Sequence, residues 1–263
     1  MTEFHQAAAA VYLAAGIAAL LGIVMPSSRL SRGAIGALVL GAALQGIGFA
    51  TLHRQPTPPA LTDLGSVGAL VAWMAVLCLV LFAWRMRLSS LAATIGFVAF
   101  LFVFASLASH SGNASVLPPE SGAWPHLHVL LASGGLALLG VASLAGCFYL
   151  LQHRRLKSKR SLGPRLPGPS LEALDRVNVI SLAVGFPLLT LGLITGMFWQ
   201  DSVSGVFWSG SPHETWMLVA WAIYVGLVST RFIWHQGARN AAATAVAGFA
   251  FLAFAVVGVG ILH

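Results

Sequence analysis

Histidine is the residue type in this sequence that could most readily do chemistry, because neutral imidazole is a common ligand for haem iron and transition metals. Of the nine histidines, His128 follows a Trp-Pro-His-Leu motif at the start of an apolar run, and His263 ends another such run. Two imidazoles at one depth of a membrane could bind a single iron from opposite sides. His126 would point to a different helix face from His128. The alternative, that histidine simply suits the polar headgroup zone, stays open for each histidine taken alone.

Other reactive patterns are weaker. Cys78 and Cys147 fall inside apolar runs and lack a Cys-x-x-Cys or metal-ligand spacing, so we interpret them as packing residues. A zinc site would need three or four neighbouring ligands, but the acids expected on the same side of the membrane as His128 are scattered over separate loops: Glu3, Asp63, Glu120, Asp201 and Glu214. The sequence has no nucleophile and base pair, phosphate-binding glycine loop or paired carboxylates, so it does not support a hydrolase or a kinase.

The elements that must position these histidines are predicted from hydropathy. The chain is 58% hydrophobic and 8% charged, with a mean hydropathy of +0.86, whereas soluble domains are roughly 25% charged. Apolar runs near the ~20 residues needed to cross a bilayer recur at 6–28, 33–52, 64–84, 88–109, 127–152, 177–200, 212–230 and 240–262. These runs predict an all-α integral membrane protein, a bundle of about eight transmembrane helices, as a single domain over 1–263 with a basic loop at 153–176.

The distribution of basic residues predicts the orientation of this bundle. Every lysine and arginine except Arg54 lies in one alternate set of loops, which the positive-inside rule places in the cytoplasm. Both termini are therefore expected on the outer, periplasmic side, with His128 and His263 at the same depth there. The net charge of +7 then orients the chain in a lipid bilayer, and no nucleic-acid partner is expected.

The stretch Trp-Ser-Gly-Ser-Pro-His-Glu-Thr-Trp, residues 208–216, combines a helix start with aromatic residues. Ser211 is a suitable N-cap and Pro212 suits the first helical position. Glu214 follows Ser211 by three residues, the spacing of a capping box. Trp208 and Trp216 would then be aromatic residues at the membrane interface.

A longer stretch resembles a known family. From Gly185 the sequence reads GFPLLTLGLITGMFWQDSVSGVFWSGSPHETWMLVAWAIYVGLVSTR, which is similar to the core of the cytochrome c assembly membrane proteins, the CcsA, CcmC and HemX-like proteins. The segment WPHLHVLLASGGLALLGVASLAGCFYLLQHRRLK and the terminal GVGILH are also similar to that family. The tryptophan-rich loop of the family, its WWD domain, is degenerate in this chain.

This resemblance implies a bacterial inner-membrane, multi-pass protein in which two outer histidines flank the tryptophan-rich loop and ligate haem b. His128 and His263 match the two iron ligands, and further cofactor contacts are implied for Trp199, Trp208, Trp216 and Glu214. The implied role is to hold haem at the outer face and present it to a partner, without bond-making catalysis on this chain. Implied partners are other cytochrome c assembly membrane proteins or apocytochrome c.

Four departures from the family pattern define an alternative. Ser204-Gly205 replaces Trp-Gly, Gly210-Ser211 replaces Trp-Asp, and His213 replaces a lysine. Ser229 stands where part of the family has an intramembrane histidine. Such losses are typical of the HemX-like branch, so the alternative is a regulatory or scaffold membrane protein that does not itself ligate haem.

Overall fold

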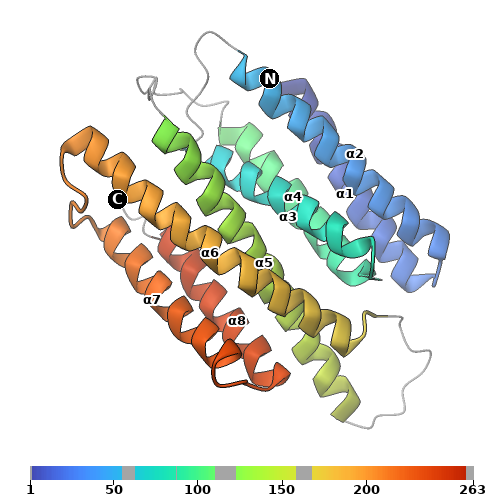
Figure 1. The fold of residues 1–263 in the computed structure, drawn as a ribbon. Helices are drawn as coiled ribbons and strands as arrows, with labels where there is room; N and C mark the ends of the chain where they lie inside the picture. Colours follow the sequence, from blue (N-terminus) through green and yellow to red (C-terminus); the bar gives the residue numbers. More distant parts are fainter. Residues whose placement is uncertain (1, 55–62, 87, 110–122, 158–167, 259–263) are drawn as a thin grey trace. The chain divides into compact units, whose positions relative to one another are not determined.

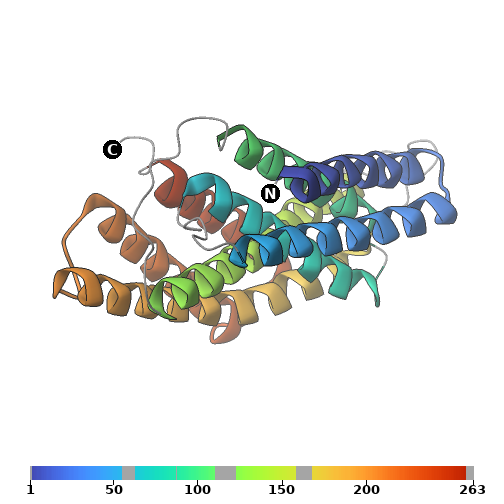
Figure 2. The same cartoon turned by 90° about the horizontal axis from the view of Figure 1, so that it is seen from above.

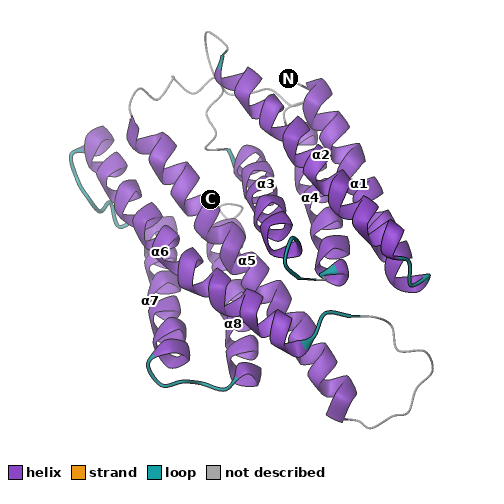
Figure 3. Cartoon of the chain, turned by 45° about the vertical axis from the view of Figure 1, so that its right-hand side comes forward, coloured by secondary structure: helices purple, strands orange, loops and turns teal. Residues whose placement is uncertain are grey.

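The computed structural model describes residues 2–54, 63–86, 88–109, 123–157 and 168–258. Within these ranges the regular secondary structure consists of helices joined by loops, with no strand (Figures 1 and 3). Eight helices in this part of the chain are long and apolar enough to cross a membrane, which confirms the predicted all-α membrane fold. They are α1 (Thr2–Val24), α2 (Ser28–His53), α3 (Leu64–Ala83), α4 (Ser89–Ser109), α5 (Ala123–Lys157), α6 (Leu171–Ser204), α7 (Pro212–Phe232) and α8 (Ala238–Ala253). The predicted orientation, with both termini outside, stays a prediction.

Two helix boundaries in the first half differ from those predicted, for local reasons. The first helix ends at Val24, not 28, because Pro26 has no backbone N–H and cannot continue it. The second begins at Ser28, not 33, where the Ser27 hydroxyl accepts a hydrogen bond from the Leu30 N–H. The apolar run placed this start too late because a helix can begin with charged residues outside the membrane.

The same effect shortens the basic loop predicted at 153–176. Helix α5 continues to Lys157 and α6 begins at Leu171, so both ends of that loop are helical. Arginine and lysine side chains in the last turn of α5 stabilise it by facing the negative end of the helix dipole. At the other end of the chain, the run predicted as 240–262 is α8 followed by a π-helix, η1 (Phe254–Gly258); residues 259–263 lie outside the described part.

The chain divides into two compact units. One comprises Met1–Ser121 with Leu162–Ser170 and contains α1 to α4, and the other comprises Gly122–Ser161 with Leu171–His263 and contains α5 to α8. That both form one integral membrane domain stays a prediction. In the first unit, α1 packs along α2 and α4 (Figure 2). The Tyr12 hydroxyl donates to Gln45 Oε1 at 2.8 Å, and Gln45 Nε2 donates to the Ala69 carbonyl at 2.9 Å, so these buried polar groups have partners.

The second unit is organised around the antiparallel pair α5 and α6, which lie alongside each other in both views (Figures 1 and 2). Their backbones approach closely at glycines. A Cβ on Gly135 would lie 2.7 Å from Leu189 N, and a Cβ on Gly185 would lie 2.9 Å from Leu138 Cβ. Helices α7 and α8 complete this unit around a shared apolar core that includes Leu139, Leu182, Leu189, Ala220, Tyr224, Ala245 and Leu252. Because both glycines would meet neighbouring atoms, the α5–α6 contact leaves no room for side chains there.

Candidate functional site

His128 lies near the start of α5 and is held by the backbone of α6. Its Nδ1 atom lies 2.8 Å from the carbonyl oxygen of Gly192. Because a carbonyl oxygen can only accept, Nδ1 carries the hydrogen and donates it. The neutral ring then has its lone pair on Nε2, for which the described residues supply no hydrogen-bond partner. The His128 side chain is half-buried, and its Nε2 lone pair is free to accept a hydrogen bond or to bind a metal ion.

Two glycines of α6, spaced four residues apart, make room for this ring. A Cβ on Gly196 would lie 2.7 Å from His128 Nδ1 and 2.9 Å from its Cε1. A Cβ on Gly192 would lie 2.8 Å from the Ala132 nitrogen. A larger residue at Gly196 would push the ring away, and one at Gly192 would separate the helix that carries the ring from its acceptor.

Aromatic side chains gather at this end of the α5–α6 pair. The Trp199 ring centroid lies 5.7 Å from that of His128, with the planes tilted by 42°. Trp124 stacks on Phe198 at 5.0 Å, and Phe198 meets Phe207 edge-on at 5.8 Å. His128 therefore has Trp199 beside it, and the start of α5 is tied to the residues that lead into the loop.

The loop between α6 and α7, residues 205–211, is shaped mainly by Glu214. Its carboxylate accepts hydrogen bonds from the Ser209 N–H at 2.9 Å, the Ser209 hydroxyl at 2.7 Å and the Gly210 N–H at 3.2 Å. The predicted N-cap is present, since the Ser211 hydroxyl accepts from the Glu214 N–H at 3.3 Å. The return bond of a capping box would come from the Ser211 N–H; here the carboxylate reaches one and two residues further back. Glu214 therefore fixes the fold of the loop.

The other two predicted tryptophans lie in this loop and in the first turns of α7. Trp208 and Trp216 are 40% and 39% exposed, high for residues of this size. Trp216 packs against Phe251 of α8 at 6.0 Å and against Phe254 of η1 at 5.9 Å. The last described segment of the chain is thus attached to the start of α7.

Of the residues predicted for the site, the structure brings His128 and Trp199 into contact, and it places Trp208, Glu214 and Trp216 in one loop and helix start. His263 lies outside the described residues, so the pairing of the two histidines stays a prediction. Within the described ranges no group of three or more histidine, cysteine, aspartate or glutamate residues could hold a metal ion.

Comparison with known proteins gives the family. The family model described as Cytochrome C assembly protein matches residues 61–263, more than half of the chain. The chain belongs to the cytochrome c assembly protein family. The matched segment contains α3 to α8 and the whole second unit, including His128 and the tryptophan-bearing loop.

The fraction of each relative's length that the chain matches differs among individual members of this family. The chain is 30% identical to "Cytochrome c biogenesis protein CcsA" of Synechococcus sp. (strain CC9902) over 218 residues, which is 73% of this chain and 71% of that protein. It is 41% identical to the protein of the same name from Prochlorococcus marinus (strain MIT 9303) over 91 residues, 35% of this chain and 29% of that protein. For the Guillardia theta protein of that name, the identity is 27% over 164 residues, 57% of this chain and 54% of that protein. The chain thus spans less than a third of one relative and about half of another.

The departures from the family pattern can now be located. Gly210 adopts a φ of +74°, a left-handed conformation that a tryptophan would adopt only with strain. His213 is exposed in the first turn of α7. Ser229 lies in the last turn of α7, where its carbonyl accepts from the Ile233 N–H at 2.8 Å. Glycine in place of the family's tryptophan at position 210 therefore accompanies a left-handed turn in the loop.

Sequence reasoning missed the residues that hold the site together. Gly192 supplies the acceptor for His128, Gly196 supplies its space, and Phe198 connects Trp124 to Phe207. One signal was available: Gly-x-x-x-Gly at 192–196 is the spacing that lets two membrane helices approach closely. The partner helix and the hydrogen bond across the contact could not be derived from that spacing alone.

Proposed function

We propose that the chain is a haem-handling protein of cytochrome c biogenesis that holds haem b at the outer face through His128 and His263. It presents the haem to a partner there, either another cytochrome c assembly membrane protein or apocytochrome c. The proposed location is the bacterial inner membrane, with both termini on the outer side. His128 and His263 would hold the haem, which would supply an iron that accepts imidazole nitrogens as ligands.

One observation carries this proposal: the bond from His128 Nδ1 to the Gly192 carbonyl. A metal-ligating histidine almost always donates its other ring N–H to a carbonyl, carboxylate or water, which fixes the tautomer and raises the basicity of the ligating nitrogen. His128 meets that requirement with a backbone acceptor. His128 therefore fits the role of a haem ligand, with Nε2 as the ligating atom.

The aromatic residues support the same proposal. A porphyrin has two apolar faces, and large aromatic side chains are well suited to cover them. Trp199 lies beside the His128 ring, and Trp208 and Trp216 each keep about two fifths of their surface exposed. Glu214 would contribute by holding the loop that carries Trp208.

The experiment is a haem titration of the full chain purified in detergent. Wild type is expected to bind one haem per chain by pyridine haemochrome assay, with the Soret and α bands of a low-spin bis-histidine complex. His128→Ala and His263→Ala should each lose the low-spin α band, while His126→Ala, two residues from the first ligand, should keep it. An unchanged spectrum in the double variant His128→Ala, His263→Ala would exclude these ligands.

The second candidate function is that of a HemX-like regulatory or scaffold membrane protein that does not ligate haem. It is favoured by the loop, where Gly210 and Ser211 replace the family's tryptophan and aspartate, and where Glu214 binds the loop's own backbone. This function predicts no stoichiometric haem in the wild-type titration, so one measurement separates the two candidates.

A further inference from the structure

A second polar site lies in the same unit, at the opposite end of α5 from His128. A half-open cavity of about 420 Å³ lies between the C-terminal turns of α5 and the first turns of α8. It is lined by Leu150, His153, Arg154, Lys157, Arg239, Asn240 and Ala243. From His128 to Arg154 the helix rises about 39 Å. A molecule bound in the cavity is therefore distinct from a haem bound at His128.

The basic side chains of this cavity have no carboxylate partner among the described residues that line it. Arg154, Lys157 and Arg239 all line it, whereas no aspartate or glutamate in the described part of the chain does. The single ion pair found among the described residues, between Arg231 and Asp175 at 2.7 Å, lies elsewhere in the unit. Three cations around one cavity repel one another unless an anion lies between them. The site is therefore suited to a group that carries negative charge.

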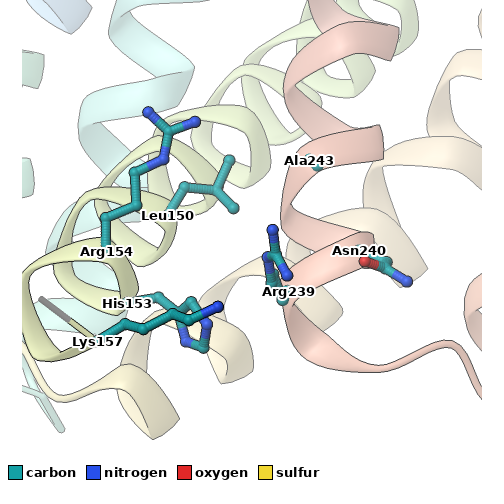
Figure 4. Close-up of a pocket in the computed structure, with 7 residues that line it drawn as sticks. All are labelled: Leu150, His153, Arg154, Lys157, Arg239, Asn240 and Ala243. Atoms are coloured by element: carbon teal, nitrogen blue, oxygen red, sulfur yellow. The ribbon is translucent and has the colours of Figure 1, made fainter.

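The geometry brings these cations in from two helices. Figure 4 shows Lys157 and His153 extending from α5 toward the side where Arg239 of α8 lies, while Arg154 extends from α5 in another direction. The His153 ring stacks on Tyr149 at 6.1 Å with an angle of 10° between the planes. The cavity thus has donors on more than one wall, as a tetrahedral oxyanion requires.

The first turn of α8 adds to the positive potential in the cavity. Its N-cap, Gly237, provides no side-chain hydrogen bond, so the first N–H groups of α8 have no cap, and Arg239 and Asn240 belong to that turn. The positive end of a helix dipole favours anions. It acts in the same direction as the three side-chain charges and opposes the negative end of the α5 dipole, which lies at the other wall of the cavity.

The rest of the lining distinguishes a lipid from a free ion. Leu150 and Ala243 give the cavity an apolar wall, placed one turn further into each helix than Arg154 and Arg239. Leu151, beside Leu150 on α5, is 51% exposed. A ligand with a charged head and an apolar tail would contact both parts, whereas free phosphate would leave the apolar wall uncovered. We propose that this cavity binds the phosphate group of an anionic phospholipid headgroup.

The test is lipid retention by the full chain, measured by native mass spectrometry from a neutral detergent with phosphatidylglycerol as the probe. Wild type should retain one phosphatidylglycerol and far less phosphatidylcholine, whose headgroup has no net charge. The double variant Arg154→Gln, Arg239→Gln should bind phosphatidylglycerol about 25-fold more weakly, because each cation near an anionic headgroup strengthens binding roughly fivefold.

A matched control removes two charges from the same unit outside the cavity: Arg155→Gln, Arg176→Gln. This control should bind phosphatidylglycerol within about twofold of wild type, and both variants should keep the wild-type circular dichroism spectrum. An equal loss of affinity in the control would overturn the proposal, since charge alone and not the cavity would then attract lipid. Protection of wild type against thermal unfolding by inorganic phosphate, without phosphatidylglycerol binding, would overturn the assignment to a lipid.

Discussion

His128 on α5 and Gly192 on α6 are joined by a hydrogen bond of 2.8 Å between the ring Nδ1 and the backbone carbonyl. The acceptor belongs to the main chain, so no substitution at position 192 can remove it directly. The bond can be broken only by moving the helices apart or by displacing the ring. The first prediction uses that property.

Gly196→Ala should displace the His128 ring, because the new Cβ would lie 2.7 Å from Nδ1. Overpacking of this kind typically costs about 1–3 kcal/mol of unfolding free energy. We expect a lower thermal midpoint by intrinsic tryptophan fluorescence and, if haem binds, weaker binding. The control is Gly226→Ala on α7, where no heavy atom lies within 4 Å of the added Cβ and where alanine should be neutral or stabilising. Equal midpoints for both variants would contradict the close contact.

Glu214→Gln should loosen the loop before α7. The carboxylate accepts from the Ser209 and Gly210 N–H groups, and hydrogen bonds to charged groups contribute about 1.5–3 kcal/mol. Hydrogen–deuterium exchange of the peptide that covers 205–213 should therefore speed up by about tenfold or more. Glu172→Gln, which removes an exposed carboxylate in the first turn of α6, should leave that peptide unchanged. Slow exchange in the Glu214 variant would show that the loop is held by other contacts.

Removing either partner of the ion pair between Arg231 and Asp175 should destabilise the second unit. One Arg231 nitrogen lies 2.7 and 2.9 Å from the two Asp175 oxygens, and the other donates to the Gln236 carbonyl at 3.0 Å. The Arg231 side chain is only 11% exposed. We expect Arg231→Ala and Asp175→Ala each to lower the free energy of unfolding by about 1.5–3 kcal/mol.

The double variant of this pair provides the check. Because the two side chains contribute through each other, Arg231→Ala with Asp175→Ala should cost clearly less than the sum of the single variants. Strict additivity of the two losses in unfolding free energy would mean that the interaction between Arg231 and Asp175 contributes nothing to stability. Arg176→Ala, an exposed arginine next to Asp175 in the sequence, is the matched control and should change the unfolding free energy by less than about 0.5 kcal/mol.

Gln45→Ala should destabilise the first unit more than Tyr12→Phe does. The glutamine connects the Tyr12 hydroxyl to the Ala69 carbonyl and is fully buried, so its removal leaves a donor and an acceptor without partners and also opens a cavity. The tyrosine change removes only the hydroxyl. Buried unsatisfied groups cost about 1–3 kcal/mol each, and chemical denaturation in mixed micelles should show this order. The reverse order would mean that water replaces the lost amide.

Hydropathy predicted the existence and number of the membrane helices because burial of apolar surface in lipid dominates their formation. It placed their ends less well, since Arg29 and Arg154 are helical although they lie outside the apolar runs. Helix ends depend on caps, dipoles and proline, which act over one turn. The Pro26 turn and the Ser27 cap are examples that a local inspection could have predicted.

The candidate site was likewise predicted in part from the sequence and set in part by contacts that the sequence does not show. His128 and Trp199 were found from residue type and family resemblance, and they lie in contact. The Gly192 carbonyl is invisible to such reasoning, because every residue has a carbonyl and only the packing of α6 on α5 selects this one. The role of Glu214 was predicted in part. Its backbone N–H donates to the Ser211 hydroxyl, as the capping pattern predicted. Its carboxylate instead accepts from Ser209 and Gly210, because Gly210 turns the loop back through a positive φ.

The close approach of α5 and α6 at their glycines has an entropic consequence for His128. The ring is confined between Gly196 and the Gly192 carbonyl when the unit folds, so its rotamer freedom is already lost in the unliganded protein. Immobilising a side chain on binding costs about 0.5–1.5 kcal/mol, and any Lewis acid that reaches Nε2 would avoid that cost. Affinity at this position would then depend on folding as well as on coordination, and variants that loosen the helix pair would weaken binding without touching a ligand.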